Sequence, residues 1–270
     1  MEYRPLGRTS EKIPVIGMGT WKIGNPHTPA ERTAQIESLT RGLELGMTFI
    51  DTAEFYGDGA SEQLVGEVIR NRRDSVFIAT KVWPTNLHHD DVLKACDRSL
   101  KRLGISHIDL YQVHWPNPRI PIRETMGAMQ ELVEGGKVRH IGVSNFSVEE
   151  TRQAAAALRR SELASNQVEY SLANRTIESG LLEFCQKERI TVIAYSPLGR
   201  GSLSARAIPE SVLAKHRMTP AQVALNWVTF QDGVVAIPKS AKREHAEENA
   251  VSLATRLSKQ DYDLISHSAG

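Results

Sequence analysis

Residues 49–56, Phe49-Ile50-Asp51-Thr52-Ala53-Glu54-Phe55-Tyr56, join a predicted buried strand to a polar loop. The strand covers Met47–Asp51 and is mostly apolar, so the carboxylate of Asp51 stands at its end. Tyr56 follows five residues later, at the start of a glycine-rich loop. Two later apolar runs also end in polar residues, Lys81 and His114. This arrangement predicts a set of polar side chains at the ends of neighbouring strands.

Short runs rich in β-branched residues alternate with amphipathic helical patterns, which is typical of a parallel sheet with helical crossovers. The predicted strands are Val15–Gly19, Met47–Asp51, Ser75–Lys81, Ile108–His114, Arg139–Ser144, Asn166–Tyr170, Thr191–Ser196 and Val234–Pro238. Seven helices are expected between these strands and one after the last. The pattern predicts an α/β protein with a (β/α)8 TIM barrel, formed by residues 1–270 as a single domain. Tyr3–Val15 is expected to form a β-hairpin that caps the barrel bottom.

A doubly wound sheet is the alternative architecture. Such a sheet is expected to carry Gly-x-Gly-x-x-Gly between its first strand and a helix. The sequence Gly17-Met18-Gly19-Thr20-Trp21-Lys22 lacks the third glycine and leads into no immediate helix. Helix starts are predicted elsewhere by capping-box patterns, which begin at Thr28, Ser147 and Thr219. The barrel is therefore preferred.

Composition and charge exclude several classes of protein. A length of 270 residues suits one α/β barrel, and a formal net charge of +1 argues against nucleic acid as a partner. No apolar run approaches the roughly 20 residues that span a bilayer, and Met1–Pro5 begins no signal peptide. The two cysteines, Cys96 and Cys185, are expected to be buried free thiols. We expect a cytoplasmic protein with no membrane contact and, since no interface pattern stands out, a monomer.

Asp51, Lys81 and His114 end the second, third and fourth predicted strands, and such ends meet at one mouth of a barrel. Tyr56 can reach the same mouth. An isolated tyrosine has a pKa of about 10. A lysine ammonium about 4 Å away favours the phenolate by on the order of 4 kcal/mol at an effective dielectric constant of about 20. We therefore expect Lys81 to lower the pKa of Tyr56, Asp51 to hold Lys81 charged, and His114 to orient a substrate oxygen.

Each of these residues alone also fits a structural role. Asp51 fits a turn cap, Asp51 and Lys81 fit a structural ion pair, and His114 fits a core histidine bonded to the backbone. Lys81 at a strand end also fits the Schiff-base lysine of an aldolase, but that role needs a neutral amine, which Asp51 opposes. The adjacent residues His88-His89-Asp90-Asp91 lack metal-ligand spacing, so no metal site is predicted.

Taken together, these motifs resemble those of the aldo-keto reductases, and the resemblance covers nearly the whole chain. The matching segments are Gly19–Trp21, Asp51–Gly57, Thr80–Lys81, Asp109–Pro116, Ile141–Phe146, Asn166–Tyr170, Ala194–Gly199 and Ile237–Ser240. The resemblance implies a (β/α)8 oxidoreductase that uses NADPH or NADH to reduce aldehydes or ketones. It implies Tyr56 as the general acid, with a hydride moving from the nicotinamide to the carbonyl carbon. An NADPH-binding regulatory or sensor protein with little turnover is the alternative.

The resemblance also implies a cofactor site at the barrel mouth. It assigns Ser144, Asn145 and Gln167 to the nicotinamide carboxamide, Tyr195 to the nicotinamide ring, and the loop 196–202 to the pyrophosphate. Ser144 and Asn145 also fit helix caps, and Tyr195 also fits a core residue. The predicted cofactor set is Thr20, Trp21, Asp51, Ser144, Asn145, Gln167, Tyr195, Ser196, Leu198, Arg200, Lys239, Ser240, Arg243, Glu248 and Asn249.

Lys239 and Ser240 suit a 2′-phosphate, which favours NADP over NAD. Many NADP-preferring relatives have an arginine six residues after this lysine, where this chain has His245. Arg243 or Lys242 is expected to substitute for that arginine. Glu248 and Asn249 match a pair that faces the adenine in the family.

The predicted substrate site contains His114 and three tryptophans, Trp21, Trp83 and Trp115, beside predicted strand ends. Phe55 is a candidate for the same surface. Such aromatic side chains suit a small-molecule carbonyl or alcohol substrate. The chain after Leu257 is short, and we expect an open site that accepts a range of aldehydes.

Overall fold

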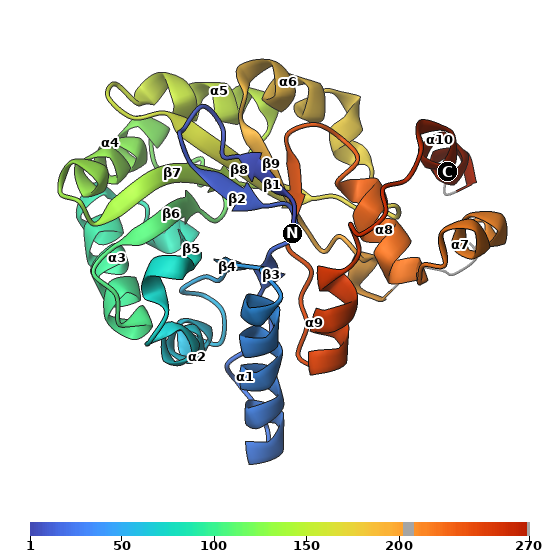
Figure 1. Ribbon diagram of the computed structural model, residues 1–270. Helices are drawn as coiled ribbons and strands as arrows, with labels where there is room; N and C mark the ends of the chain where they lie inside the picture. The colour runs from blue at the N-terminus through green and yellow to red at the C-terminus, as the bar shows by residue number, and fades with distance from the viewer. Residues whose placement is uncertain (202–207, 269–270) are drawn as a thin grey trace.

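The computed structural model describes residues 1–201 and 208–268, which form a ring of parallel strands surrounded by helices (Figure 1). The sheet order follows the chain order from β3 to β10. The first and last strands are joined by backbone hydrogen bonds, from the N–H of Gly17 to the carbonyl of Ala236 and from the N–H of Ala236 to the carbonyl of Val15, each 2.8 Å long. The ring is therefore closed. The prediction of a (β/α)8 barrel is confirmed, and a doubly wound sheet is excluded.

The barrel strands are β3 Met18–Gly19, β4 Phe49–Asp51, β5 Phe77–Val82, β6 Ile108–Val113, β7 Val138–Ser144, β8 Leu163–Glu169, β9 Thr191–Tyr195 and β10 Val234–Ala236. The helices are α1 Pro29–Glu44, α2 Ala60–Ile69, α3 His89–Leu103, α4 Ile122–Glu134, α5 Val148–Ala157, α6 Leu181–Glu188, α7 Glu210–His216, α8 Pro220–Val228, α9 Arg243–Ala250 and α10 Lys259–Ser268. All eight predicted strands are present. The predicted helix count differs near the C-terminus, because the described residues form two α-helices between β9 and β10 and two after β10.

The strands at the closing seam are shorter than predicted. β3 contains two residues of the expected Val15–Gly19, and β10 ends at Ala236. Along the seam, isolated bridges pair Ile16 with Ala236 and Gly19 with Lys239. Gly19 and Lys239, at the two ends of the predicted sheet, are therefore direct neighbours.

The N-terminal hairpin closes one end of the barrel (Figure 1). Its strands, β1 Tyr3–Pro5 and β2 Lys12–Pro14, pair antiparallel. Leu6 and Ile13 are fully buried in the apolar cluster that fills the lower barrel interior. The guanidinium of Arg4 donates hydrogen bonds of 2.6 Å to three backbone carbonyls between residues 229 and 234. The predicted cap is confirmed.

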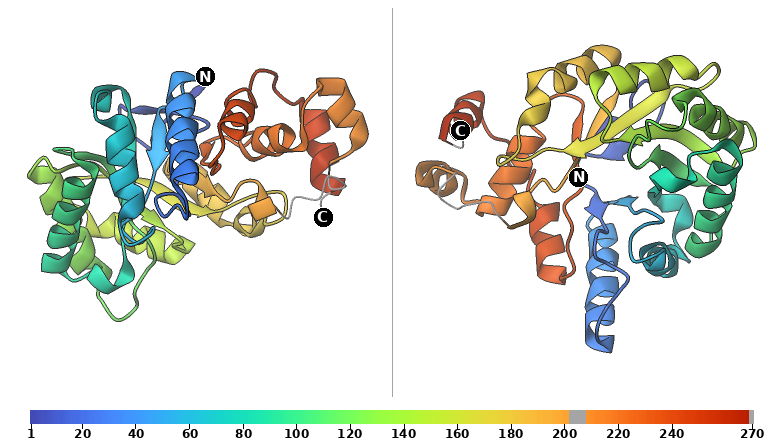
Figure 2. Two further views of the ribbon diagram at one scale, coloured as in Figure 1. Left: turned by 90° about the horizontal axis from the view of Figure 1, so that it is seen from below. Right: turned by 180° about the vertical axis from the view of Figure 1, so that it is seen from behind.

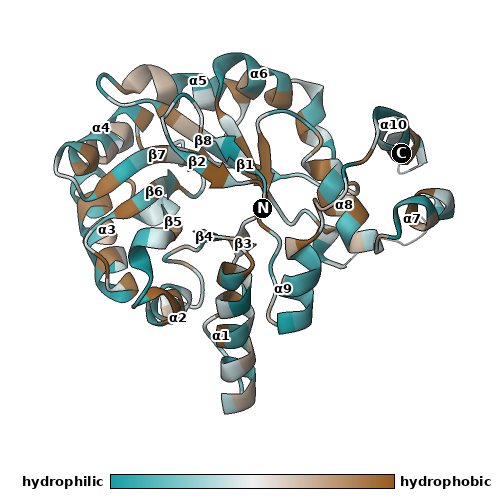
Figure 3. Ribbon diagram, viewed as in Figure 1, coloured by the Kyte–Doolittle hydropathy of each residue, from teal (hydrophilic) through white to brown (hydrophobic). Residues whose placement is uncertain are grey.

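Apolar side chains form a second layer between the strands and the surrounding helices (Figure 3). Helix α3 shows why the sequence folds in this way. Its buried residues Val92, Ala95, Cys96, Ser99 and Leu103 follow the spacing of one helix face, while its other face is charged. The helix ends where Gly104 adopts a φ of 66°, a left-handed conformation that glycine accepts at low cost.

Two of the three predicted capping boxes form completely, at Ser147 and at Thr219. At the third, the Thr28 side chain accepts from the N–H of Glu31, but the Glu31 carboxylate accepts from the N–H of His27. The first helix therefore has a single side-chain cap in place of the reciprocal pair.

The last helix, α10, lies beside α7 at the edge of the molecule (Figure 2). The ammonium of Lys215 donates to both carboxylate oxygens of Asp261, at 3.0 and 2.7 Å. In the part of the chain that the structure describes, no helix is long and apolar enough to cross a bilayer.

Candidate active site

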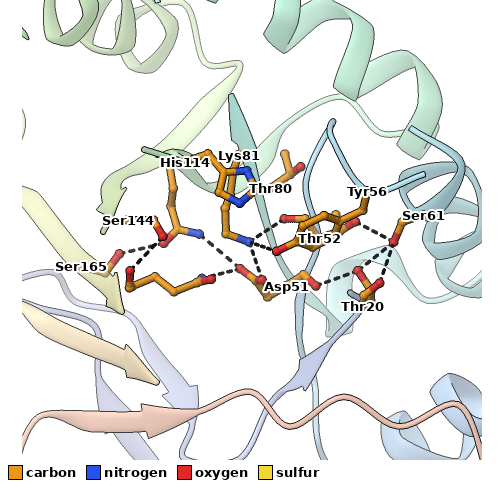
Figure 4. Close-up of polar contacts among 12 residues, drawn as sticks. Thr20, Asp51, Thr52, Tyr56, Ser61, Thr80, Lys81, His114, Ser144 and Ser165 are labelled. Atoms are coloured by element: carbon orange, nitrogen blue, oxygen red, sulfur yellow. Dashed lines mark hydrogen bonds and ion pairs between the residues drawn. The ribbon is translucent and has the colours of Figure 1, made fainter. Parts of the chain in front are cut away.

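Asp51, Lys81 and Tyr56 form a hydrogen-bonded chain at the C-terminal end of the barrel strands (Figure 4). The ammonium nitrogen of Lys81 donates to Oδ1 of Asp51 at 2.5 Å, to the carbonyl of Thr52 at 2.9 Å and to the hydroxyl oxygen of Tyr56 at 3.4 Å. A lysine ammonium has three N–H groups, so all three have an acceptor. Because the Tyr56 oxygen accepts from Lys81, its own proton is available to another acceptor.

The ion pair between Lys81 and Asp51 is almost completely removed from solvent, with exposed fractions of 0% and 1%. Burial lowers the pKa of Lys81, but the charges of Asp51 and Tyr56 and the hydrogen bonds that Lys81 donates to them outweigh it, so the pKa is raised. The amine therefore remains an ammonium at neutral pH. This excludes the neutral lysine that Schiff-base chemistry requires.

Lys81 lowers the pKa of Tyr56 as expected, but the net direction of the pKa shift is upward. Tyr56 is 9% exposed, and burial is the largest influence on its pKa, which it raises. The charge of Lys81 lowers that pKa, while the charge of Asp51 raises it again, and the net direction is upward. Tyr56 therefore keeps its proton through neutral pH, which suits an acid that gives a proton to a carbonyl oxygen.

His114 directly follows β6 and faces the same site. Its ring centroid lies 5.7 Å from that of Tyr56 and 5.0 Å from that of Trp83, both in edge-to-face geometry. Burial, followed by the charge of Lys81, lowers the pKa of His114 to about 2. Its Nδ1 atom is buried and has no hydrogen-bond partner among the residues that the structure describes. His114 is therefore a neutral imidazole that can hydrogen-bond a substrate oxygen.

We expect the His114 ring to stay uncharged from about pH 5 to pH 8. An ordinary histidine gains its charge in this range, and the unfolded chain would do so near its usual pKa of 6.5. Acidification below that value should therefore remove stability, since only the unfolded state takes up this proton. Nitrogen NMR chemical shifts, assigned with a His114→Gln variant, provide the measurement. A His114 resonance that titrates near pH 6.5 would contradict this expectation.

Aromatic side chains surround the tyrosine and histidine. Trp21 lies edge-on to Tyr56 with ring centroids 5.0 Å apart, and Phe55 stacks on Trp83 at 3.8 Å. Trp115 follows His114 and, like Trp21 and Phe55, is nearly half exposed. The backbone N–H of Trp83 donates to the buried carboxylate of Glu54 at 2.7 Å. Glu54, from the stretch that carries Tyr56, thereby fixes the position of the Trp83 loop.

The residues assigned to the carboxamide form a network that reaches both Asp51 and His114. The Ser144 hydroxyl donates to the Gln167 carbonyl at 2.8 Å, and the Asn145 amide donates to the His114 carbonyl at 3.0 Å. The Tyr195 hydroxyl donates to the Asn145 side-chain oxygen at 2.9 Å. The Gln167 amide nitrogen donates to Oδ2 of Asp51 at 2.7 Å. The structure therefore joins four of the predicted cofactor residues to the catalytic candidates.

Lys239 lies at the seam, paired with Gly19 and therefore close to the mouth. Burial and the nearby charge of Lys22 lower the pKa of Lys239. Neither lysine has an acidic partner within ion-pair distance among the residues that the structure describes, so this corner carries uncompensated positive charge. Arg243 lies one helical turn from Glu247 and donates to it at 3.2 Å.

Three other predicted cofactor residues have side chains engaged within the protein. The Ser240 hydroxyl donates to the Lys242 carbonyl at 2.6 Å. The Glu248 carboxylate accepts from the Thr219 hydroxyl at 2.5 Å, at the start of α8. The Thr20 hydroxyl is buried and donates to the Asp51 carbonyl at 2.9 Å. Asn249 is buried nearby on α9.

The loop after β9 places Ser196 and Arg200 against each other, through a hydrogen bond of 3.1 Å between the guanidinium and the hydroxyl. Arg200 also lies 3.6 Å from the carboxylate of Glu169. Leu198 packs against the outer apolar layer. Ser202, the last residue assigned to this loop, lies outside the described residues.

Sequence reasoning missed two residues of this region, Gln112 and Lys22. The Gln112 amide nitrogen lies 3.3 Å from Oδ2 of Asp51. Its place two residues before His114 puts it on the same face of the strand, and this spacing could have identified it. Lys22 directly follows Trp21, but its proximity to Lys239 arises only from closure of the seam.

Comparison with known proteins agrees with this geometry. The model of the Aldo/keto reductase family matches residues 15–269. Methylglyoxal reductase YeaE of Escherichia coli is 38% identical over 94% of this chain and 90% of its own length. The crystal structure of the thermostable aldo-keto reductase Tm1743 superimposes with a TM-score of 0.93, at 42% identity over 99% of this chain and all of that one.

A Klebsiella pneumoniae aldo/keto reductase, crystallised with NADP and acetate, superimposes with a TM-score of 0.87. It is 38% identical, over 95% of this chain and 91% of that one. The chain belongs to the aldo-keto reductase family and is an oxidoreductase of that class.

Proposed function

We propose that this enzyme reduces small aldehydes and ketones to alcohols with NADPH, and that Tyr56 is its general acid. The observation that carries the assignment of Tyr56 is the hydrogen bond from the Lys81 ammonium to the tyrosine oxygen. The ammonium is held by the buried Asp51 and stabilises negative charge on the oxygen as the proton leaves. Asp51, Lys81 and Tyr56 therefore each have a distinct role in a single proton transfer.

The residues of the site act on the carbonyl oxygen of the substrate. The neutral imidazole of His114 orients this oxygen by a hydrogen bond, and the Tyr56 hydroxyl donates its proton to it. When bound, a reduced nicotinamide cofactor supplies the hydride that the carbonyl carbon receives. The O–H bond of Tyr56 breaks as the O–H bond of the alcohol forms, and Lys81 stabilises the phenolate that remains. The high pKa of Tyr56 keeps the acid protonated before the step.

The donor set at the mouth fits a nicotinamide dinucleotide. Ser144, Asn145 and Gln167 provide the hydroxyl and amide groups that a carboxamide needs, and Tyr195 lies beside them. Lys22 and Lys239 provide cations at the seam that have no ion-pair partner within residues 1–201 and 208–268, which suits the phosphates. Arg243, the first residue of helix α9, and Lys242, its N-cap, are the candidates to replace the arginine that is absent at position 245.

NADPH should be preferred over NADH. A Lys239→Met, Arg243→Met double variant is expected to raise KM for NADPH by roughly tenfold or more and to leave KM for NADH nearly unchanged, because only NADPH carries the 2′-phosphate. Steady-state kinetics with both cofactors provide the measurement. Lys259→Met, which removes an exposed lysine paired with Asp263, is the matched control. Equal losses for the two cofactors would contradict a 2′-phosphate role.

The substrate class follows from the exposed aromatic groups. Trp21, Phe55 and Trp115 offer exposed apolar surface, and the Trp21 ring lies edge-on to Tyr56. We infer small uncharged carbonyl compounds, including 2-oxoaldehydes of the kind named for YeaE. An absorbance assay of NADPH oxidation with methylglyoxal, benzaldehyde and a keto acid tests this. Tight cofactor binding without turnover of any carbonyl compound would favour a sensor and overturn the reductase.

We also infer that the enzyme is a cytoplasmic monomer that acts on free small molecules. The net charge of +1 provides no field that attracts a nucleic acid or a membrane surface. Light scattering at micromolar concentration tests the oligomeric state, and a dimeric mass would contradict the inference.

A further inference from the structure

The carboxylate of Asp51 is held at both of its oxygens. Oδ1 accepts from Lys81 at 2.5 Å, while Oδ2 accepts from the amide nitrogens of Gln167 at 2.7 Å and Gln112 at 3.3 Å. All four side chains are buried, with exposed fractions of 0–1%. The orientation of the carboxylate toward Lys81 therefore depends on the two amides behind it.

The two glutamines differ in what else they contact. Gln167 belongs to the group of side chains that suit the cofactor carboxamide, so its amide has a second partner when the enzyme is loaded. The oxygen of Gln112 instead lies 3.5 Å from the Ser165 hydroxyl, within the barrel interior. Gln112 is thus the donor to Asp51 that does not depend on the cofactor.

Gly142, in the strand beside Gln112, leaves space for the glutamine side chain. A Cβ atom on Gly142, in the adjacent strand β7, would lie 2.9 Å from Cγ of Gln112 and would also clash with the Ser165 hydroxyl. Gly142 does not have a positive φ, so its backbone does not require glycine. The absence of a side chain at position 142 therefore leaves room for Gln112.

We propose that Gln112 is a positioning residue for carbonyl reduction, which holds the Asp51 carboxylate against Lys81 and so sets the acidity of Tyr56. Asp51 raises the pKa of Tyr56, and a hydrogen-bond donor on Oδ2 draws negative charge away from the tyrosine. The other titratable groups around Tyr56 are Lys81 from β5, His114 after β6 and Tyr195 at the end of β9. None of these groups reaches Oδ2 of Asp51, which is left to the amides.

Replacing Gln112 by methionine keeps the length of the side chain and removes the donor. We expect kcat to fall roughly tenfold, as for a lost hydrogen bond to a charged group, with little change in KM or in cofactor affinity. The pKa of Tyr56 should rise by about half a unit to one unit, because the negative charge of Asp51 is less compensated. The apparent pKa in the pH profile of kcat for reduction should rise by the same amount.

Replacing Gln112 by glutamate provides the sharper test. A protonated glutamate can donate to Asp51 as the amide does, whereas an ionised one repels it. The activity of Q112E relative to wild type should therefore be highest at acidic pH and should fall as pH rises. A role in packing alone would give no such dependence. G142A, whose added Cβ would lie 2.4 Å from the Ser165 hydroxyl and 2.9 Å from Cγ of Gln112, should lower kcat in the same direction as Q112M.

The experiment combines kcat profiles across pH with ultraviolet titration of tyrosinate in the cofactor-free protein, and takes the difference from Y56F. The inference rests on the proposed role of Tyr56, but the titration needs no turnover. An inactive wild type would therefore overturn the proposed function alone, while an unchanged Tyr56 titration in Q112M would overturn the role of Gln112. A wild-type kcat in Q112M, or a loss of kcat in Q112E that is the same at every pH, would also overturn the role of Gln112. If neither variant folds, Gln112 is a residue of the fold and the inference fails.

Discussion

Replacing Tyr56 by phenylalanine is expected to lower kcat for aldehyde reduction by roughly 10²–10⁴-fold and to leave cofactor affinity close to that of wild type. The change removes one oxygen, that of the proposed proton donor. Lys81 keeps two of its three acceptors, Asp51 and the Thr52 carbonyl, so the ion pair remains in place. The aromatic ring remains to pack against Trp21.

Single-turnover kinetics with bound cofactor measure this effect, because they report the chemical step without product release. Tryptophan fluorescence quenching measures cofactor affinity separately. Trp21→Phe, at the exposed ring that contacts Tyr56, is the matched control, and we expect it to affect KM more than kcat. A Tyr56→Phe enzyme with a near-normal rate would show that another group donates the proton.

Replacing Lys81 by methionine should reduce both stability and activity, for separate physical reasons. The variant leaves Asp51 charged and buried without its cation, which costs on the order of 3–5 kcal/mol of unfolding free energy. It also leaves Tyr56 with no positive charge to stabilise the phenolate, so kcat should fall by at least as much as in Tyr56→Phe. Chemical denaturation and steady-state kinetics measure the two effects.

A second substitution separates these effects. Adding Asp51→Asn to Lys81→Met removes the unpaired charge, while the asparagine oxygen can still accept from Gln112 and Gln167. We expect the double variant to regain most of the lost stability and none of the lost activity. A Lys81→Met protein as stable as wild type would contradict a stabilising role for the ion pair between Lys81 and Asp51.

Much of this site was predictable, because it depends on strand ends and barrel geometry. Short apolar runs in the sequence predict the strands, and therefore place Asp51, Lys81 and His114 at the ends of consecutive strands. The capping boxes at Ser147 and Thr219 are also local, since each depends on four adjacent residues.

The features that the sequence did not reveal depend on the whole barrel. The direction of the Tyr56 pKa shift is set by how much protein covers its hydroxyl, and no local pattern contains that quantity. The contact of Gln112 with Asp51 crosses the barrel interior between β6 and β4, which are not adjacent strands. The hydrogen bond from the Thr219 hydroxyl to the Glu248 carboxylate likewise depends on how α8 packs against α9.

The N-terminal cap has a consequence for how the protein is made. Arg4 leaves the ribosome well before its hydrogen-bond partners, because its guanidinium binds carbonyls 225–230 residues later in the chain. Strand β3 also has no partner on one side until β10 has been synthesised. Arg4 and the seam edge of β3 must therefore wait for their partners while the intervening chain is made. Closure of the ring is a late event, and the nascent chain depends on keeping these early segments from aggregating until then.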